Sequence, residues 1–545
     1  MAAINKMEAA VGKARKSADF PPSYWGDFFI SLPMAPSSSM SESSVAELKE
    51  QVREMLRHVN DPMREMVLID TIQRLGLKYH FEHEIDASLK ILNDTCFDYD
   101  LHLFSLHFRL LRQGGYSIPS NGFNKFKDNT GKFKESLKFD AKGLLSLYEA
   151  AHMGTQGDEI LDEAIDFTRG HLKFLKNNVS PSLAMDISRA LEMPLRKGME
   201  RIQARQYISI YEKDEARDDI LLKLAKLDYN QMQKLHQEEL RKISMWWKEL
   251  GLVKKLSYAR DRVVECYFWA MAVYHEPHYG RARTIYTKVL KLISLMDDTY
   301  DVYGTLDELV PFHETIQRWD LGGIEQLPDY MKDYILALTD TFKIIEEELA
   351  LEGNSYHVDY LKKAFTTLSK SYLDEVIWGS KKYMPTFKEY LKVAVKSCGF
   401  PAATCLSFVG MGDVVTKEVF DWVLTIPPMV YNASLVCRLH DDLNPNELEQ
   451  MEAHSPTAIR CYMKDNGVSE EEARLKIGKM VVDAWKAINE EMVINASPIP
   501  IEVRKRALNL ACSIEVIFRN ADSYNYPAGE MKDNVAMLVV DPVPI

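Results

Sequence analysis

Apolar residues recur at three- and four-residue spacing along almost the whole chain, interrupted only by short polar breaks. The pattern is clear over residues 45–56, 144–152 and 160–174, and this spacing is typical of one face of an amphipathic helix. Turn-forming residues are scarce: 25 glycines and 22 prolines among 545 residues fall below the roughly 12% of an average protein. We therefore expect an all-α fold.

The most polar stretch in mid-chain, residues 211–219, separates two long helical portions. We place the domain boundary there, because a chain of this length has room for more than one domain. The expected organisation is a flexible N-terminal segment over 1–20, a helical N-terminal domain over 21–219 and a C-terminal domain over 220–545. The segment Cys398–Pro401 interrupts an apolar helix and indicates either a helix–helix turn or a pocket-lining kink.

The net charge of −13 argues against a nucleic-acid-binding face, which needs clustered Lys and Arg. Seven cysteines without CxxC spacing fit reduced thiols in a cytosolic protein. No apolar run is long enough to span a bilayer, and the N-terminus lacks the apolar core of a secretory signal. We expect a cytoplasmic monomer with no nucleic-acid or membrane partner.

The strongest chemical signal is the segment DDTYD at 297–301, directly after the apolar run 289–296. If that run is a helix, Asp297 and Asp301 lie one turn apart on one face, and Asp298 points about 100° away. Carboxylates at a helix C-terminus repel one another and the helix dipole, so a divalent cation would stabilise them. Mg²⁺ fits, because it prefers oxygen ligands and keeps positions for substrate phosphates. The alternative is a solvated acidic helix end, which the apolar lead-in disfavours.

Two further groups carry charge in a suggestive pattern. Asp441 and Glu449 are eight residues apart, a little over two helical turns, with Pro445 between them, and this spacing also suits a metal. Arg260 and Arg262 are two residues apart; in a loop both guanidiniums would converge on one anion. Taken alone, such a pair more often forms surface ion pairs.

Together these groups resemble the plant class I terpene synthases, specifically the cytosolic sesquiterpene cyclases, and the resemblance covers essentially the whole chain. It is carried by DDTYDVYGT at 297–305, ARDRVVECYFW at 259–269, QRWD at 317–320, LGLKYHFEHEI at 75–85 and FRLLRQGGYS at 108–117. Arg15-Lys16 match the family's tandem-basic element, with Lys in place of the second Arg. The resemblance implies two helical domains, the C-terminal one a class I terpenoid synthase helical bundle whose open end holds the metal site. The class II signature DxDD is absent, which implies a non-catalytic N-terminal domain.

The resemblance also implies the metal ligands. Asp297 and Asp301 match the ligands of the family's aspartate-rich motif, with Asp298 as a supporting partner, and Glu375 matches the acidic position on the facing helix. The family's second metal motif falls on Asp441, Pro445 and Glu449. Three Mg²⁺ ions are expected, with Mn²⁺ as a substitute. The third site is incomplete in sequence, because Pro445 has no side-chain oxygen.

The remaining implied site residues bind the diphosphate or face the hydrocarbon. The diphosphate-binding positions fall on Arg260, Arg262 and Arg438. Trp269 falls on the pocket wall, and Asp522 and Tyr524 form a pair at the pocket rim that assists proton transfer. A carbocation survives only where water is excluded, and aromatic faces attract it. For Trp269 alone core packing would be the better interpretation, and its place beside the arginine pair favours the pocket.

The implied substrate is an allylic prenyl diphosphate. The lack of a long transit segment favours farnesyl diphosphate, which would be ionised with Mg²⁺ and cyclised to a sesquiterpene hydrocarbon or alcohol, releasing diphosphate. Two alternatives stay open: a monoterpene synthase acting on geranyl diphosphate, and an impaired paralogue that binds a prenyl diphosphate with little turnover. Pro445 is the residue that keeps the second alternative open.

Overall fold

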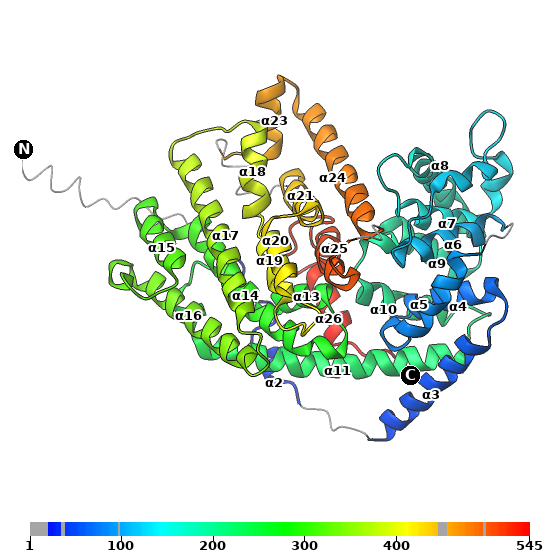
Figure 1. The fold of residues 1–545 in the computed structure, drawn as a ribbon, viewed down its shortest axis with the longest axis horizontal. Coiled ribbons are helices and arrows are strands. Elements are labelled where there is room, and N and C mark those ends of the chain that lie inside the picture. Colours follow the sequence, from blue (N-terminus) through cyan, green and yellow to red (C-terminus); the bar gives the residue numbers. More distant parts are fainter. Residues whose placement is uncertain (1–19, 34–38, 96–98, 445–454, 494–496) are drawn as a thin grey trace, which may run out of the picture.

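The computed structural model describes residues 20–33, 39–95, 99–444, 455–493 and 497–545. Within these ranges the regular structure is helical, and the one bridge between extended segments pairs Lys127 with Phe133. The all-α prediction is confirmed. Figure 1 shows two helical bodies side by side, with the long helix α11 (Asp219–Leu250) running along one edge of both.

The N-terminal body consists of short amphipathic helices whose apolar faces form three adjoining cores. Several helices begin at a polar residue whose side chain accepts a backbone N–H, as Asp61, Asp100 and Ser180 do. The helices are α3 (Ser39–His58), α4 (Pro62–Arg74), α5 (Glu82–Asn93), α6 (Leu101–Gln113), α7 (Ala141–Ala151), α8 (Glu159–Leu175), α9 (Pro181–Glu192) and α10 (Glu200–Tyr211). Short 3₁₀ turns link them: η1 (Lys78–His80), η2 (Ser120–Phe126), η3 (Glu135–Phe139), η4 (Lys176–Asn178) and η5 (Leu195–Lys197).

The C-terminal body has one large core, and α13, α19 and α25 run through it with nearly every residue buried. Its first helices are α12 (Leu252–Lys255), α13 (Val263–Val273), α14 (Gly280–Asp298), α15 (Leu306–Arg318), α16 (Asp329–Ala350), α17 (Tyr356–Ser380) and α18 (Phe387–Ser397). The later ones are α19 (Phe400–Phe408), α20 (Lys417–Leu424), α21 (Pro428–Leu443), α23 (Ala458–Asn466), α24 (Glu470–Met492), α25 (Ile501–Ile517) and α26 (Glu530–Val539). Single turns form at η6 (Pro277–Tyr279) and η8 (Ile324–Gln326).

Helix α11 is shared by the two bodies, although it begins at the predicted domain boundary. Leu224, near its start, belongs to an N-terminal core, whereas Leu240 and Ile243 belong to the C-terminal core. Trp25 and Phe29, beside and within the short helix α2 (Phe28–Ser31), also pack in the C-terminal core. The two bodies are therefore interlocked at α11 and at the first described residues, and the boundary at residue 219 stays a prediction.

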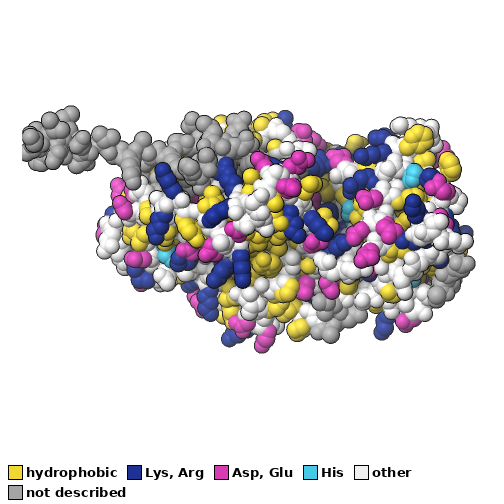
Figure 2. Space-filling view, turned by 90° about the horizontal axis from the view of Figure 1, so that it is seen from above, with side chains coloured by type: hydrophobic (Ala, Val, Ile, Leu, Met, Phe, Trp, Pro, Cys, Tyr) yellow, Lys and Arg dark blue, Asp and Glu magenta, His cyan; other side chains and the backbone are white. Residues whose placement is uncertain are grey.

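The interruption at Cys398–Pro401 is a turn between α18 and α19. Gly399 has φ of +79°, which glycine adopts without strain, and Pro401 lies in the first turn of α19, where a missing N–H costs nothing. Six cysteines in the described residues are free thiols, and Cys96 lies outside them. The structure contains no described helix that combines the length and apolarity needed to cross a bilayer. On the face in Figure 2, basic and acidic side chains intermingle wherever residues are described.

Candidate active site

The aspartate segment lies where α14 changes its winding. The apolar run 289–296 is α-helical, as predicted, and Leu292 and Met296 are buried within it. The α-helix ends at Asp298, and Thr299–Tyr303 form a π-helical turn, η7. The spacing of the two outer aspartates is thus set by a wider turn than the α-helix that we expected. Such π-helical segments occur frequently at functional sites.

Arg260 ties this helix end to the segment that precedes α13. Its backbone N–H donates to Asp298 Oδ2 over 2.8 Å, and its Nε lies 2.7 Å from Asp298 Oδ1. Its Nη2 lies 2.5 Å from Asp297 Oδ2. Burial opposes the charge of Arg260, but the carboxylates of Asp298 and Asp297 hold its pKa well above the ordinary value. The predicted arginine and the aspartate segment therefore meet in space.

Glu375, on α17, joins the same group of carboxylates. Ser397, at the end of α18, donates its hydroxyl to Glu375 Oε1 over 2.6 Å. Asp301 keeps solvent-accessible surface. Its pKa nevertheless lies well above the ordinary value, because the surrounding protein removes part of its hydration and because the charges of Asp297 and Glu375 repel its own. Burial also raises the pKa of Glu375, although Arg438 opposes the shift. Carboxylates that disfavour one another's charge in this way are stabilised by a cation.

This donor set fits Mg²⁺, because it consists of carboxylate oxygens with no thiolate or imidazole among them. Within the described residues, no three His, Cys, Asp or Glu side chains already stand close enough to coordinate one ion. Asp297 is engaged by Arg260 and Glu375 by Ser397. An ion would therefore have to share these carboxylates with their present partners or displace them.

Arg438 and the acidic end of α21 form a second charged group. Arg438 Nη1 lies 3.0 Å from Asp441 Oδ2 and 4.0 Å from Asp442 Oδ1. Asp442 is buried and accepts hydrogen bonds from the Tyr390 hydroxyl (2.7 Å) and the Ala458 N–H (2.8 Å). Asp442 therefore anchors the end of α21, and the predicted ligand Asp441 is the partly exposed member of the pair.

Two predicted elements of the site lie outside the described residues, as does the flexible segment predicted over residues 1–20 except for its last residue. One is Glu449 with Pro445, which would complete the second metal motif, and the other is the tandem-basic element Arg15-Lys16. The third metal site and its missing hydroxyl therefore stay predictions from sequence.

Arg262 does not reach the carboxylates in this structure. Its side chain is fully buried, and its guanidinium donates to backbone carbonyl oxygens of Asp261 (2.9 Å), Tyr524 (3.0 Å), Asn525 (3.0 Å) and Pro21 (2.8 Å). Arg262 thus links the first described residues and the segment around Tyr524 to the start of α13 by hydrogen bonds. Its role as a diphosphate ligand stays a prediction.

Trp269 and Tyr524 form one aromatic corner. Their ring centroids are 5.2 Å apart, with the ring planes at 51°. The Trp269 indole N–H donates to Ser513 Oγ over 2.7 Å, and the Tyr524 hydroxyl donates to Ser294 Oγ over 2.7 Å. The Arg260 guanidinium lies 5.1 Å from the centre of the Tyr524 ring. The structure thus brings the predicted aromatic pair beside the predicted diphosphate-binding arginine.

Asp522 shapes the turn that carries Tyr524. Its Oδ1 accepts the backbone N–H groups of Tyr524 and Asn525, each over 3.0 Å. Burial raises the pKa of Asp522. Asn525 Oδ1 in turn accepts from Arg260 Nη1 over 2.8 Å, so the turn and the aspartate segment are joined through one arginine.

Sequence reasoning missed the polar partners of these groups, which are Asn525, Ser397, Ser294 and Ser513. The signal for Asn525 is its position three residues after Asp522, where an Asx-type turn supports it. The three serines had no local signal, because each meets a partner that is at least 22 residues away in the sequence.

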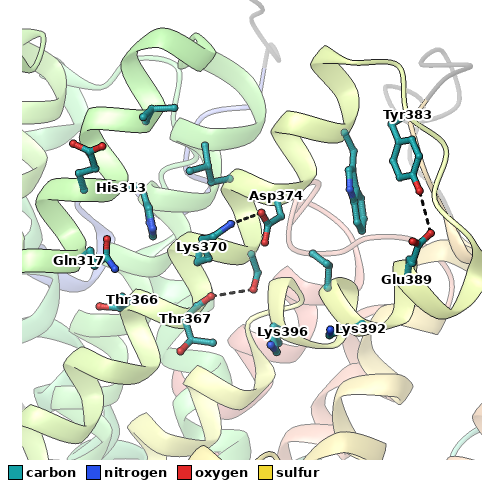
Figure 3. Close-up of a pocket in the computed structure, with 16 residues that line it drawn as sticks. His313, Gln317, Thr366, Thr367, Lys370, Asp374, Tyr383, Glu389, Lys392 and Lys396 are labelled. Carbon is teal, nitrogen blue, oxygen red and sulfur yellow. Dashed lines mark hydrogen bonds and ion pairs between the residues drawn. The ribbon is translucent and has the colours of Figure 1, made fainter.

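A separate cavity of about 800 Å³ lies on the outer face of α17, between α15 and α18 (Figure 3). None of the predicted site residues lines it. Its charged lining is mixed, with both basic and acidic side chains: Lys370, Lys392, Lys396, Glu314, Asp374 and Glu389. Asp374 pairs there with Lys370, whereas its neighbour Glu375 bonds to Ser397. Adjacent carboxylates of α17 therefore have partners on different sides of the helix, one in the outer cavity and one on α18.

Comparison with known proteins agrees with this arrangement. Residues 24–191 match the terpene synthase N-terminal domain, and residues 248–487 match the metal-binding domain of the terpene synthase family. Beta-cubebene synthase of Magnolia grandiflora is 47% identical over 537 residues, covering 97% of this chain and 98% of that protein. The (−)-germacrene D synthase of Vitis vinifera is 46% identical over 537 residues, covering 97% of this chain and 96% of that protein.

Solved structures give the same result. A limonene synthase with 2-fluorolinalyl diphosphate superposes with a TM-score of 0.92 at 33% identity, covering 97% of this chain and all of that one. Isoprene synthase from grey poplar leaves, with three Mg²⁺ ions and dimethylallyl-S-thiolodiphosphate, has a TM-score of 0.86 at 34% identity, covering 93% and 98%. The chain belongs to the terpene synthase family. Its C-terminal bundle is the class I terpenoid synthase fold, as predicted.

Proposed function

We propose that this terpene synthase ionises farnesyl diphosphate in an Mg²⁺-dependent step and cyclises the resulting carbocation to a sesquiterpene. The relatives named above, at 46% and 47% identity over nearly the full chain, support the sesquiterpene class. The observation that carries the proposal is the meeting of Arg260 with the aspartate segment, beside an aromatic corner. The charged group suits the diphosphate and the aromatic corner suits the hydrocarbon cation, and the reaction needs both beside the same substrate.

The carboxylates would hold the metal. We assign Asp297, Asp301 and Glu375 to this task, with Asp441 and Glu449 as ligands of a third ion. When bound, Mg²⁺ supplies positive charge to the diphosphate leaving group. Arg260, Arg262 and Arg438 would add fixed positive charge to the same group, which stabilises the charge that develops as the carbon–oxygen bond breaks.

The aromatic corner would face the cation. Trp269 keeps accessible surface while the helix around it is buried, and Tyr524 lies against it. A ring face attracts a desolvated cation by on the order of 0.5–2 kcal/mol. Asp522 holds the Tyr524 segment in place. We assign proton transfer at the pocket rim to the Tyr524 hydroxyl and the Asp522 carboxyl group.

The test is an incubation of the purified protein with Mg²⁺ and, separately, geranyl, farnesyl and geranylgeranyl diphosphate, with products separated by gas chromatography and mass spectrometry. We expect sesquiterpene products from farnesyl diphosphate at the highest kcat/KM. A higher value with geranyl diphosphate would replace the proposal by a monoterpene synthase. Tight binding of farnesyl diphosphate without turnover would identify the impaired paralogue. We further propose a cytoplasmic monomer, which sedimentation and localisation of a tagged protein would test.

A further inference from the structure

Helix α13 keeps solvent-accessible surface at one residue. Every residue of Val263–Val273 is buried except Trp269, although the helix runs through the core. Trp269 is thus the one residue of α13 that a ligand can contact through accessible surface. The orientation of its ring decides what a ligand bound against α13 meets.

Ser513 fixes the ring orientation through a complete hydrogen-bond chain. The Trp269 indole N–H donates to Ser513 Oγ over 2.7 Å, and the Ser513 hydroxyl donates to the Leu510 carbonyl over 2.6 Å. An indole nitrogen can only donate, so the serine proton must point to Leu510. Ser513 is fully buried, so its hydroxyl is shielded from bulk solvent. The chain joins α13 to α25 through one serine.

The neighbouring ring is fixed in the same way from a third helix. The Tyr524 hydroxyl donates to Ser294 Oγ, and Ser294 lies on α14 one turn before the aspartate segment. The two rings meet at 5.2 Å. Each ring is thus anchored at its polar edge by a serine of a different helix. Tyr524 is buried, so the accessible surface of the pair belongs to Trp269.

We infer that Ser513 is a positioning residue: it holds the face of Trp269 toward the carbocation and so sets the ratio of products. The inference rests on the proposed function. Cation–π attraction depends on the cation lying over the ring face. Loss of the serine acceptor removes the hydrogen bond of the indole N–H, so the ring is no longer held in this orientation. Different positions of the positive charge along the substrate are then stabilised.

The test compares Ser513→Ala with Ser513→Thr and with the control Ser407→Ala. Ser407, on α19, is also fully buried and donates to a carbonyl three residues earlier, that of Thr404, over 2.7 Å. The control therefore loses the same kind of bond without releasing an indole. We expect Ser513→Ala to change the ratio of major to minor products by about 2- to 30-fold. Ser513→Thr should restore the ratio, and Ser407→Ala should leave it unchanged.

A double-mutant cycle with Trp269→Phe shows whether Ser513 acts through the indole. Phenylalanine has no N–H, so Ser513→Ala should change nothing further in that background. Unchanged ratios in Ser513→Ala, or the same change in both backgrounds, would overturn the inference while leaving the proposed function intact. Lack of any turnover in the wild type and in Ser407→Ala would overturn the proposed function itself, and this inference with it. Thermal melting of each variant shows whether it is folded.

Discussion

Arg260 meets Asp298 twice, through its backbone N–H at 2.8 Å and through its Nε at 2.7 Å. Asp298 is 1% exposed and belongs to the aspartate segment, and both of its carboxylate oxygens contact Arg260. The middle aspartate thus positions the guanidinium that also contacts Asp297. One segment provides both the predicted metal ligands and the support for a predicted diphosphate-binding arginine.

This pairing makes Arg260 important for stability as well as for turnover. We expect Arg260→Ala to lower the free energy of unfolding by about 3–5 kcal/mol, because it leaves Asp298 buried without its partner. The rate of product formation should fall by a factor of roughly 10 to 1,000, because the variant lacks one positive charge beside the diphosphate leaving group. Urea unfolding and product formation measure the two effects. The control Arg281→Ala breaks a partly exposed pair with Glu352 and should cost no more than about 1 kcal/mol.

Adjacent carboxylates of α17 should differ sharply in function. We expect Glu375→Ala to lower the rate at least roughly tenfold and to raise the Mg²⁺ concentration needed for half-maximal rate, because it removes a charge beside Asp301. Asp374→Ala should leave both unchanged, because Asp374 lies in the outer cavity with Lys370 (Figure 3). Mg²⁺ titrations of the two variants provide the comparison. Equal effects would remove Glu375 from the proposed metal site.

The substitution Pro445→Thr would add the hydroxyl that the second metal motif lacks. We expect it to lower the Mg²⁺ concentration for half-maximal activity, or to raise the rate, because the third ion gains an oxygen ligand. Mg²⁺ titrations of the variant and the wild type side by side measure this. Superimposable curves would mean that another group already supplies the missing oxygen.

Glu265 should make stability depend on pH. It is fully buried on α13, and desolvation raises its pKa to about 7. The folded state therefore keeps a proton that the unfolded state, with a pKa near 4.3, has already lost, so stability falls as pH rises from about 4.3 to 7. In Glu265→Gln this contribution, roughly 1.4 kcal/mol per pH unit at most, disappears. Urea unfolding from pH 5 to 8 should show that the free energy of unfolding of the variant rises relative to that of the wild type. A difference between the two free energies that does not change with pH would contradict the assignment.

The sequence predicted the parts of this molecule that depend on local order. Helical spacing predicted the all-α fold, and an apolar run followed by aspartates predicted the end of α14. It did not predict the π-helical turn of Thr299–Tyr303, because nothing in residue spacing distinguishes a π-turn from an α-turn. Contacts within one segment can be predicted in this way, whereas the winding of a single turn depends on its packing.

Contacts between residues that are far apart in the sequence could not be predicted, for a different reason. Arg260 and Arg262 looked equivalent, but Arg260 meets carboxylates, whereas Arg262 is buried among carbonyl groups that include that of Pro21, far away in sequence. The serines that hold Glu375 and Trp269 also come from other helices. Only the packing of the helices determines which polar groups meet.

We propose that the carboxylates around Asp297 and Asp301 hold the Mg²⁺ needed to ionise farnesyl diphosphate. The most direct measurement is the rate of diphosphate release from farnesyl diphosphate by the wild type, with Mg²⁺, with excess EDTA, and after Mg²⁺ is restored, beside folded Asp301→Ala. We predict release that stops in EDTA, returns with Mg²⁺, and is abolished in Asp301→Ala with an unchanged melting temperature. Release that persists in EDTA, or a variant within several-fold of the wild type, would contradict the metal site.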